Sequence, residues 1–219
     1  MCISENLKKI NSELPEHVTL VAVSKTKPVE ALQEAYNVGQ RIFGENKIQE
    51  MESKWREMPK DIQWHMIGHV QRNKVKFMAP FVSLIHAVDS FKLLKEINKE
   101  ALKNERTIEC LLQIKIAEEE SKFGMNKEEA TNLLTSEEFK KLKNIKVVGL
   151  MGMATFTDNK AQVLGEFQKL KEIYDALKIQ NPLFRILSTG MSGDYALAIK
   201  NGSTMVRVGS AIFGERNYI

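Results

Sequence analysis

The chain has 219 residues, of which 43% are hydrophobic and 27% charged, as in an ordinary globular protein. Its 32 basic and 28 acidic residues are mixed along the chain and give a net charge of +4, which argues against a dedicated nucleic-acid binder. The two cysteines, Cys2 and Cys110, provide no disulfide framework, and no apolar run reaches membrane-spanning length. The segment after Met1 is polar and unlike a signal-peptide core, so we expect a cytoplasmic protein.

Apolar runs of strand length alternate with amphipathic helical patterns along the chain. The predicted strands are residues 18–25, 41–46, 62–68, 82–88, 108–116, 145–154, 184–188 and 204–209. A helix over residues 2–14 precedes the first strand, and each strand except the last is followed by another helix. Pro28 opens the helix after the first strand, and the helix after the third strand is expected over residues 70–79. The longest link, from Ala117 to Met125, is a polar loop.

Strict alternation of strands and helices predicts a parallel sheet. Eight such units in a chain of this length match the compact end of the (β/α)8 range. The alternative is an open doubly wound sheet, but no G-x-G-x-x-G follows the first strand and no G-x-x-x-x-G-K-[ST] occurs. We therefore predict the α/β class and a (β/α)8 TIM barrel, with residues 1–219 as a single domain.

The first predicted strand ends at a lysine. Lys25 lies on the same side of that strand as Val21 and Val23, because side chains alternate with period two. Its ammonium either extends into solvent over the apolar stem or is kept for chemistry, since desolvation lowers a lysine pKa and a neutral amine attacks a carbonyl to form a Schiff base. Lys27 lies further out, in the loop before Pro28, so Lys25 is the better candidate.

The last two predicted strands end in segments rich in glycine and hydroxyl groups. In a barrel the active site lies at the C-terminal ends of the strands, and phosphate often binds after strands seven and eight. Residues 188–193 and 209–210 occupy these positions, and Ser192 comes just before a short helix. Their glycines are either turn residues or part of a phosphate site. Arg207 shares its side of the strand with Gly209 and is predicted to point into the barrel mouth, with a salt bridge on the rim as the alternative.

A lysine that faces a phosphate site across the same rim suits a phosphorylated aldehyde. The amine would condense with the carbonyl while the opposite rim binds the phosphate. Pyridoxal phosphate fits this description, and so does a sugar phosphate of the aldolase class.

Five motifs carry a more specific resemblance. They are Ala22-Val-Ser-Lys25-Thr-Lys-Pro28, Phe43-Gly-Glu-Asn46, Trp64-His-Met-Ile-Gly68 followed by Gln71 and Asn73-Lys74, Ser188-x-Gly-Met-Ser192-x-Asp194, and Gly202-Ser-Thr-Met-Val-Arg207-Val-Gly-Ser-Ala-Ile-Phe-Gly214. In this order, and over nearly the whole chain, they resemble the pyridoxal phosphate homeostasis protein family, which is similar to the N-terminal barrel of alanine racemase. The departures are small: His69-Val70 stands where Pro-Leu is commoner, and Ser210 where Thr is common.

The resemblance implies a barrel of the pyridoxal phosphate fold type III without the C-terminal β-domain. It implies pyridoxal 5′-phosphate as the cofactor, held as a Schiff base on Lys25. Arg207 would face the pyridine nitrogen, and Asn46 and His65 would lie near the ring. The residues implied around the phosphate are Ser188, Met191, Ser192, Gly209 and Ser210.

Other residues that attract attention have simpler interpretations. His65 and His69 have the spacing of zinc ligands only in a helix, but they straddle a strand and its loop, so we predict no metal site. His86 and Cys110 are interpreted as strand-core residues. Gln113 is interpreted as a polar filler of the barrel interior without an assigned role.

Catalysis with pyridoxal phosphate needs a protein base over the α-carbon of the substrate, and the strand ends offer no evident catalytic dyad. As the alanine racemase family is understood, a separate β-domain supplies a second acid–base tyrosine, for which this chain has no room after Gly214. An arginine against the pyridine nitrogen also disfavours the protonated ring, which is the stronger electron sink. We therefore expect a carrier and assign no catalytic residue.

The expected function is intracellular vitamin B6 homeostasis, in which the protein buffers pyridoxal phosphate and delivers it to apo-enzymes as transient partners. We expect a monomer with no nucleic-acid or membrane partner. The alternatives are a single-domain, pyridoxal phosphate-dependent amino-acid racemase and, against the family resemblance, a Schiff-base aldolase.

Overall fold

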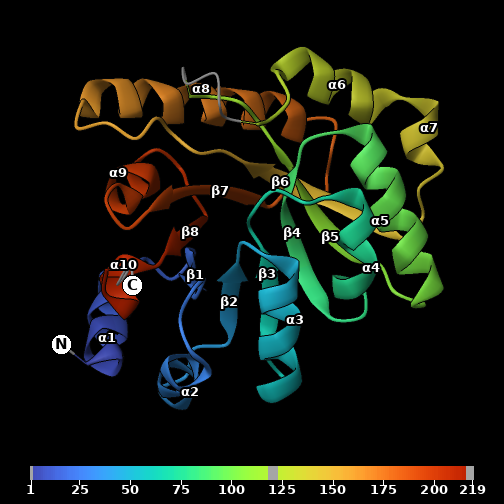
Figure 1. Cartoon of the computed structure of the whole chain (residues 1–219). Coiled ribbons are helices and arrows are strands. Elements are labelled where there is room, and N and C mark those ends of the chain that lie inside the picture. Colours follow the sequence, from blue (N-terminus) through green and yellow to red (C-terminus); the bar gives the residue numbers. More distant parts are fainter. Residues whose placement is uncertain (1, 118–122, 216–219) are drawn as a thin grey trace.

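The computed structural model describes residues 2–117 and 123–215. Its eight parallel strands close into a barrel in chain order, because β8 pairs with β1 as well as with β7 (Figure 1). The strands are β1 (Thr19–Val23), β2 (Ile42–Glu45), β3 (Gln63–Met66), β4 (Val82–Val88), β5 (Ile108–Gln113), β6 (Ile145–Met151), β7 (Ile186–Met191) and β8 (Met205–Val208). The closed barrel confirms the predicted fold and excludes the open sheet.

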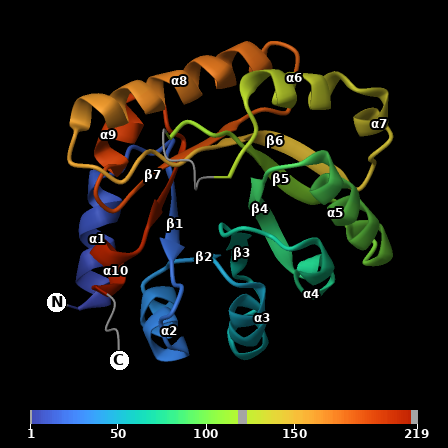
Figure 2. The same ribbon diagram turned by 45° about the horizontal axis from the view of Figure 1, so that its top comes forward.

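Helices surround the barrel on its outside (Figure 2). They are α1 (Ile3–Glu13), α2 (Val29–Asn37), α3 (Ile48–Glu57), the short 3₁₀ helix η1 (Arg72–Lys74), α4 (Val75–Met78), α5 (Phe91–Lys103), α6 (Lys127–Thr135), α7 (Glu137–Lys140), α8 (Lys160–Lys178), α9 (Tyr195–Lys200) and α10 (Ser210–Phe213). The first and last helices, α1 and α10, lie side by side, and the Asn6 amide donates a hydrogen bond of 2.9 Å to the Ile212 carbonyl. Within the described ranges, no helix is both long and apolar enough to cross a membrane.

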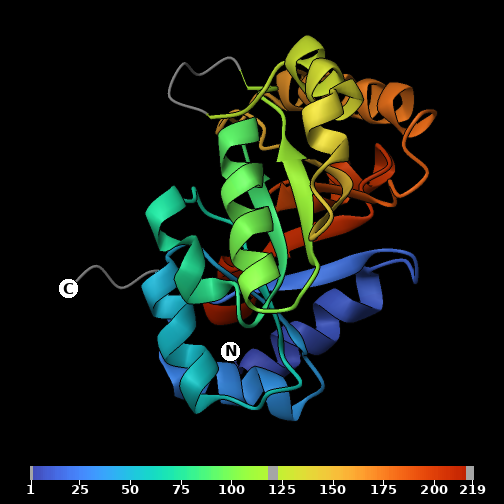
Figure 3. The same cartoon turned by 90° about the vertical axis from the view of Figure 1, so that its right-hand side faces the viewer.

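Both faces of the barrel wall are buried, which explains the nearly continuous apolar strands. One set of side chains fills the barrel interior: Val21, Leu84, Ala87, Leu111, Val148, Met151 and Met205. The other set packs outward against the helices, as Ala22 and Leu112 do in the same core as Phe167 of α8. Figure 3 shows α5 lying over the outside of the wall, where it contacts β5 and β6.

The structure corrects the predicted elements near the cavity-bearing rim. β7 spans Ile186–Met191 instead of 184–188. The strand continues past Ser188 through Gly190, whose φ is +96°, and the register of its pairing with β8 shifts between Ser188 and Met191. The helix predicted at 70–79 is reduced to η1 and α4, and Pro28 precedes α2 as its N-cap. A short helix, α10, also follows the last strand. The polar link from Ala117 to Met125 lies partly outside the described residues.

Candidate functional site

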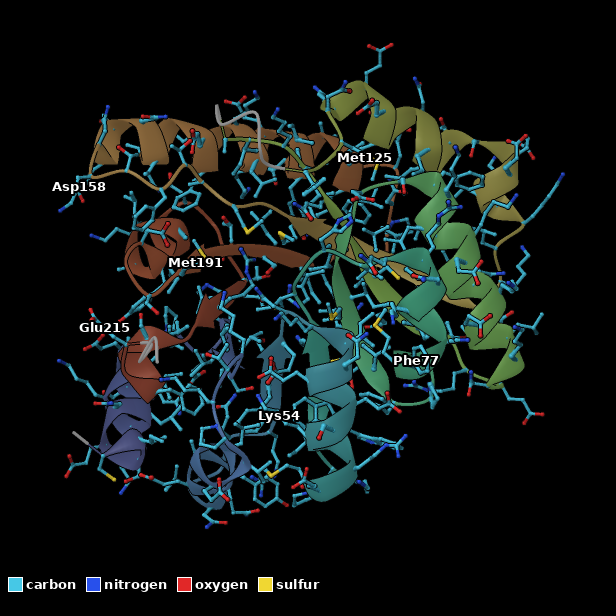
Figure 4. All side chains as sticks on the ribbon, in the orientation of Figure 1. Lys54, Phe77, Met125, Asp158, Met191 and Glu215 are labelled. Carbon is cyan, nitrogen blue, oxygen red and sulfur yellow. The ribbon has the colours of Figure 1, made fainter. Side chains whose placement is uncertain are left out.

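A cavity of about 670 Å³ opens at the carboxyl ends of the strands. Among the described residues, its walls are formed by segments that follow every strand except β4, together with residues of β1, β5, β7 and β8. The predicted site residues that line it are Lys25, Asn46, Met191, Ser192, Arg207, Gly209 and Ser210. Figure 4 labels two lining residues on this rim, Met191 at the end of β7 and Asp158 in the loop before α8. Barrel closure thus brings residues from both ends of the chain onto one rim.

Two predicted site residues, His65 and Ser188, are buried and are not among the described residues that line the cavity. They belong to a hydrogen-bonded chain inside the barrel. Arg207 donates from Nη1 to Ser188 Oγ (2.6 Å), and Ser188 Oγ lies 3.1 Å from His86 Nδ1. His86 Nε2 lies 3.1 Å from His65 Nδ1. Ser188 and His65 are therefore connected to the cavity through Arg207.

Burial fixes the charges along this chain. It lowers the pKa of His65 to about 3 and the pKa of His86 well below the usual 6.5, and for His86 the neighbouring His65 and Arg207 add repulsion. Burial also lowers the pKa of Arg207 to about 10, against the attraction of Asp194. At neutral pH both histidines are therefore neutral, and Arg207 carries the positive charge.

Arg207 lies inside the barrel mouth, as its position on the same side of β8 as Met205 predicts. It donates from Nη1 to the Ser188 carbonyl (2.9 Å) and from Nη2 to the Gly152 carbonyl (3.0 Å). Hydrogen bonds to backbone oxygens thus replace the rim salt bridge that was the alternative interpretation.

The ends of β7 and β8 are joined by one hydroxyl group. Ser192 Oγ accepts hydrogen bonds from the backbone N–H groups of Gly209 (3.1 Å) and Ala211 (3.5 Å). A Cβ atom on Gly209 would lie 3.2 Å from the Val23 carbonyl oxygen, so a residue without a side chain suits this close approach to β1. Because Ser192 Oγ accepts both of these hydrogen bonds, its own O–H is left to donate to an anion in the cavity that Ser192 lines.

Lys25 and Lys27 both line the cavity. The Lys27 ammonium donates to the carbonyl oxygens of Phe213 (2.9 Å), Gly214 (3.1 Å) and Glu215 (3.1 Å). Carbonyl groups at the C-terminal end of a helix lack intrahelical partners, so Lys27 caps α10. Lys27 thus has a structural task at the end of α10.

Two residues acquire roles that the sequence interpretation did not assign. His86 is a link in the buried hydrogen-bonded chain, and its position two residues after the inward-facing Leu84 was the signal that it faces the interior. Gln113 lines the cavity, and its amide donates to the Phe123 carbonyl (2.8 Å). Cys110 packs in the outer core, where burial raises the pKa of its thiol.

No group of three or more His, Cys, Asp or Glu side chains within residues 2–117 and 123–215 is arranged to bind a metal ion. His65 is the last but one residue of β3, and His69 lies in the loop beyond it. The two side chains therefore do not share a helix face.

The closed barrel, with its cavity at the carboxyl ends of the strands, places this protein in the (β/α)8 class, and comparison with known families identifies its relatives. The family model described as alanine racemase, N-terminal domain, matches residues 2–217, so the chain belongs to this family. Its sequence is 38% identical to the pyridoxal phosphate homeostasis protein of Vibrio alginolyticus, over 99% of this chain and 98% of that protein. It is 40% identical to the pyridoxal phosphate homeostasis protein of Aquifex aeolicus, over 91% and 87%. The chain is thus a member of the pyridoxal phosphate homeostasis protein family, which confirms the predicted resemblance.

Solved structures show the same architecture. PipY from Synechococcus elongatus, determined with pyridoxal phosphate bound, superimposes with a TM-score of 0.88 at 34% identity and covers 97% of this chain and 100% of its own. An alanine racemase from Clostridium difficile aligns with a TM-score of 0.77 at 16% identity, over 98% of this chain and 56% of its own. The second likeness shows the fold alone.

Proposed function

We propose that this protein binds pyridoxal 5′-phosphate in the cavity and serves the homeostasis of that cofactor. The observation that carries the proposal is that Lys25, Arg207 and Ser192 line the same cavity at the carboxyl ends of the strands. Two comparisons support it: PipY was solved with pyridoxal phosphate bound, and the curated relatives are named pyridoxal phosphate homeostasis proteins.

The residues present fit the polar groups of the cofactor. The phosphate would bind against the Ser192 hydroxyl, which accepts from the N–H groups of Gly209 and Ala211 and would donate its own proton to a phosphate oxygen, with Met191 and Ser210 beside it. Arg207 would face the ring nitrogen, and Asn46 would lie near the ring. When bound, pyridoxal phosphate supplies an aldehyde carbon, which the Lys25 amine attacks with loss of water to form a Schiff base.

A holding and delivery role suits this site better than turnover of amino acids. Arg207 stays charged at neutral pH because its pKa is about 10, and a cation beside the ring nitrogen disfavours protonation of the ring. Two other titratable residues of the cavity have structural partners: Asp194 accepts a hydrogen bond from the Met191 N–H, and His69 Nδ1 lies 3.3 Å from Asp89 Oδ2. The protein would act as a monomer in the cytoplasm, with cofactor-requiring apo-enzymes as transient partners.

The binding site is tested by an absorbance spectrum of the purified protein with added pyridoxal phosphate, before and after borohydride reduction. The expected result is a near-visible band that borohydride removes, with the pyridoxyl mass on Lys25 in peptide mapping. Absence of the band, or labelling of Lys27 in place of Lys25, would contradict the proposed site.

Carrier and racemase are separated by a second measurement. The loaded protein is incubated with alanine in deuterium oxide and, separately, with a cofactor-free aminotransferase. A carrier activates the aminotransferase and introduces negligible deuterium at the α-carbon. Steady incorporation that depends on Lys25 would identify the racemase instead.

A further inference from the structure

A buried cluster of charged side chains lies behind the loop that carries Lys25. Lys54 of α3, labelled in Figure 4, is 5% exposed, and Glu45 at the end of β2 is fully buried. Lys54 Nζ lies 2.8 Å from Glu45 Oε1 and 2.7 Å from Glu50 Oε1. None of these three side chains is among the described residues that line the cavity, and the proposed function gives them no task.

The cluster is hydrogen-bonded to the residues on both sides of Lys25. Lys54 Nζ donates to the Ser24 carbonyl (2.8 Å), and the Ser24 hydroxyl donates to Glu45 Oε1 (2.6 Å). On the other side, the Thr26 N–H donates to Glu50 Oε1 (2.5 Å). The backbone is therefore fixed immediately before and after the lysine, whose side chain lines the cavity.

Both the turn and the cluster carry an energetic cost. Thr26 has a φ of +64°, a left-handed conformation that is unfavourable for a β-branched residue and that persists where the surroundings hold it. Burial raises the pKa of Glu45, although Lys54 opposes this by attraction and hydrogen bonding, so keeping the carboxylate ionised here is unfavourable. Buried ion pairs can often be replaced by apolar residues of similar volume without loss of stability. The hydrogen bonds to Ser24 and Thr26, on either side of Lys25, suggest a function for this charged cluster that apolar side chains would not provide.

We propose that Glu45, Glu50 and Lys54 are positioning residues for the Lys25 amine. By holding the turn from Ser24 to Thr26, they keep the amine where it meets an aldehyde bound in the cavity. The inference rests on the proposed function, in which Lys25 forms the Schiff base. Attack on a carbonyl depends steeply on the alignment of the amine, so a loosened turn slows the reaction more than it weakens binding.

The sharpest test compares two substitutions of Glu50, whose side chain is 23% exposed and therefore tolerates replacement. Glu50→Ala removes the oxygen that accepts from the Thr26 N–H, whereas Glu50→Gln keeps an amide oxygen for it. We expect Schiff-base formation, followed by stopped-flow absorbance, to be on the order of tenfold slower in Glu50→Ala and within about twofold of the native rate in Glu50→Gln. A double variant, Glu45→Gln with Lys54→Met, removes both buried charges together and is expected to react at least as slowly as Glu50→Ala.

A second ligand separates positioning from general damage. Pyridoxine 5′-phosphate carries an alcohol in place of the aldehyde and forms no Schiff base, so its dissociation constant is expected to stay unchanged in Glu50→Ala. Glu100→Ala is the control, because Glu100 also pairs with a lysine of its own helix, Lys103 (2.7 Å) on α5, away from the loop. It is expected to leave both the rate and the affinity unchanged.

Two results would overturn the inference. One is a native rate of Schiff-base formation in Glu50→Ala. The other is a loss of affinity for pyridoxine phosphate in Glu50→Ala as large as the loss of rate with pyridoxal phosphate, which would show a merely structural role. If the unaltered protein binds pyridoxine phosphate but forms no Schiff base with pyridoxal phosphate, the proposed function itself fails, and the inference fails with it.

Discussion

Single polar atoms join the segments that surround the cavity, and Ser192 Oγ is one of them. It accepts from the N–H groups of Gly209 and Ala211, and a hydroxyl group at that point is suited to contact a phosphate. Charge-assisted hydrogen bonds of this kind contribute about 1.5–3 kcal/mol each. Replacement of Ser192 therefore tests directly where the phosphate binds.

We predict that Ser192→Ala weakens the binding of pyridoxal phosphate by on the order of ten- to a hundredfold. Pyridoxal, which lacks the phosphate, serves as the control ligand and is expected to bind the variant and the native protein equally. Fluorescence titration measures both dissociation constants. An equal loss of affinity for the two ligands would place the phosphate elsewhere.

The buried histidines couple the stability of the barrel to pH. An unfolded chain protonates histidine below about pH 6.5, whereas His65 in the folded protein does so only near pH 3. Between these values the unfolded state binds more protons, so the free energy of unfolding falls as the pH is lowered. For each such histidine the fall amounts to at most about 1.4 kcal/mol per pH unit.

We predict that His65→Asn flattens the dependence of unfolding free energy on pH between about 6 and 4. His17→Asn is the control, because His17 is exposed, and it is expected to keep the native slope. Urea unfolding at several pH values measures both slopes. A native slope in His65→Asn would show that other groups dominate the acid response.

At the scale of elements, the close contact between β6 and β7 depends on a residue without a side chain. Gly149 has a φ of +154°, and a Cβ atom there would lie 1.8 Å from the Ile186 carbonyl oxygen. Backbone atoms cannot move aside without breaking the pairing of Gly149 with Ile186. A side chain at position 149 would therefore disturb the register of β7, whose last residue, Met191, lines the cavity.

We predict that Gly149→Ala lowers the free energy of unfolding by about 3 kcal/mol or more. Gly165→Ala is the matched control, because Gly165 is exposed in α8 and a Cβ atom there meets no atom within 4 Å. That change is expected to stabilise the protein by about 0.5–1 kcal/mol, through helix propensity. Urea unfolding of both variants measures the difference, and equal effects of the two changes would refute the argument.

At the scale of the whole molecule, pairing of β1 with β8 closes the barrel. Lys25 follows β1, while Gly209 and Ser210 follow β8, and all three residues line the same cavity. A ligand bound to both sides therefore spans the closure between the first and last strands. Binding and closure should strengthen each other.

We predict that pyridoxal phosphate at a hundred times its dissociation constant raises the free energy of unfolding by about 2.7 kcal/mol. Amide hydrogen exchange is expected to slow most in β1 and β8. Lys25→Ala should lose part of this protection, because phosphate contacts alone leave the β1 side unattached. Protection spread evenly over all eight strands would contradict a ligand that spans the closure.

Local patterns predicted much of this molecule. Alternating apolar runs and amphipathic segments predict eight strands and their helices, because buried strands and amphipathic helices have different hydrophobic periods. Strand order then places Lys25, Arg207 and the turn at Gly209 at the carboxyl ends, where a barrel forms its site. The family motifs are contiguous in sequence, so the resemblance needed no tertiary information.

Tertiary structure decided which side chains of different strands touch, because the alternation of side chains along a single strand does not specify this. His65 and Ser188 lie in the buried chain with His86, a set of contacts among three strands that no local pattern encodes. The irregular end of β7 depends on its pairing with β8, so its length was mispredicted. The contacts of Lys54 with the residues beside Lys25 likewise exist only once α3 packs on the barrel. Sequence determines which side chains face a common interior, whereas the register between distant strands determines which of them touch.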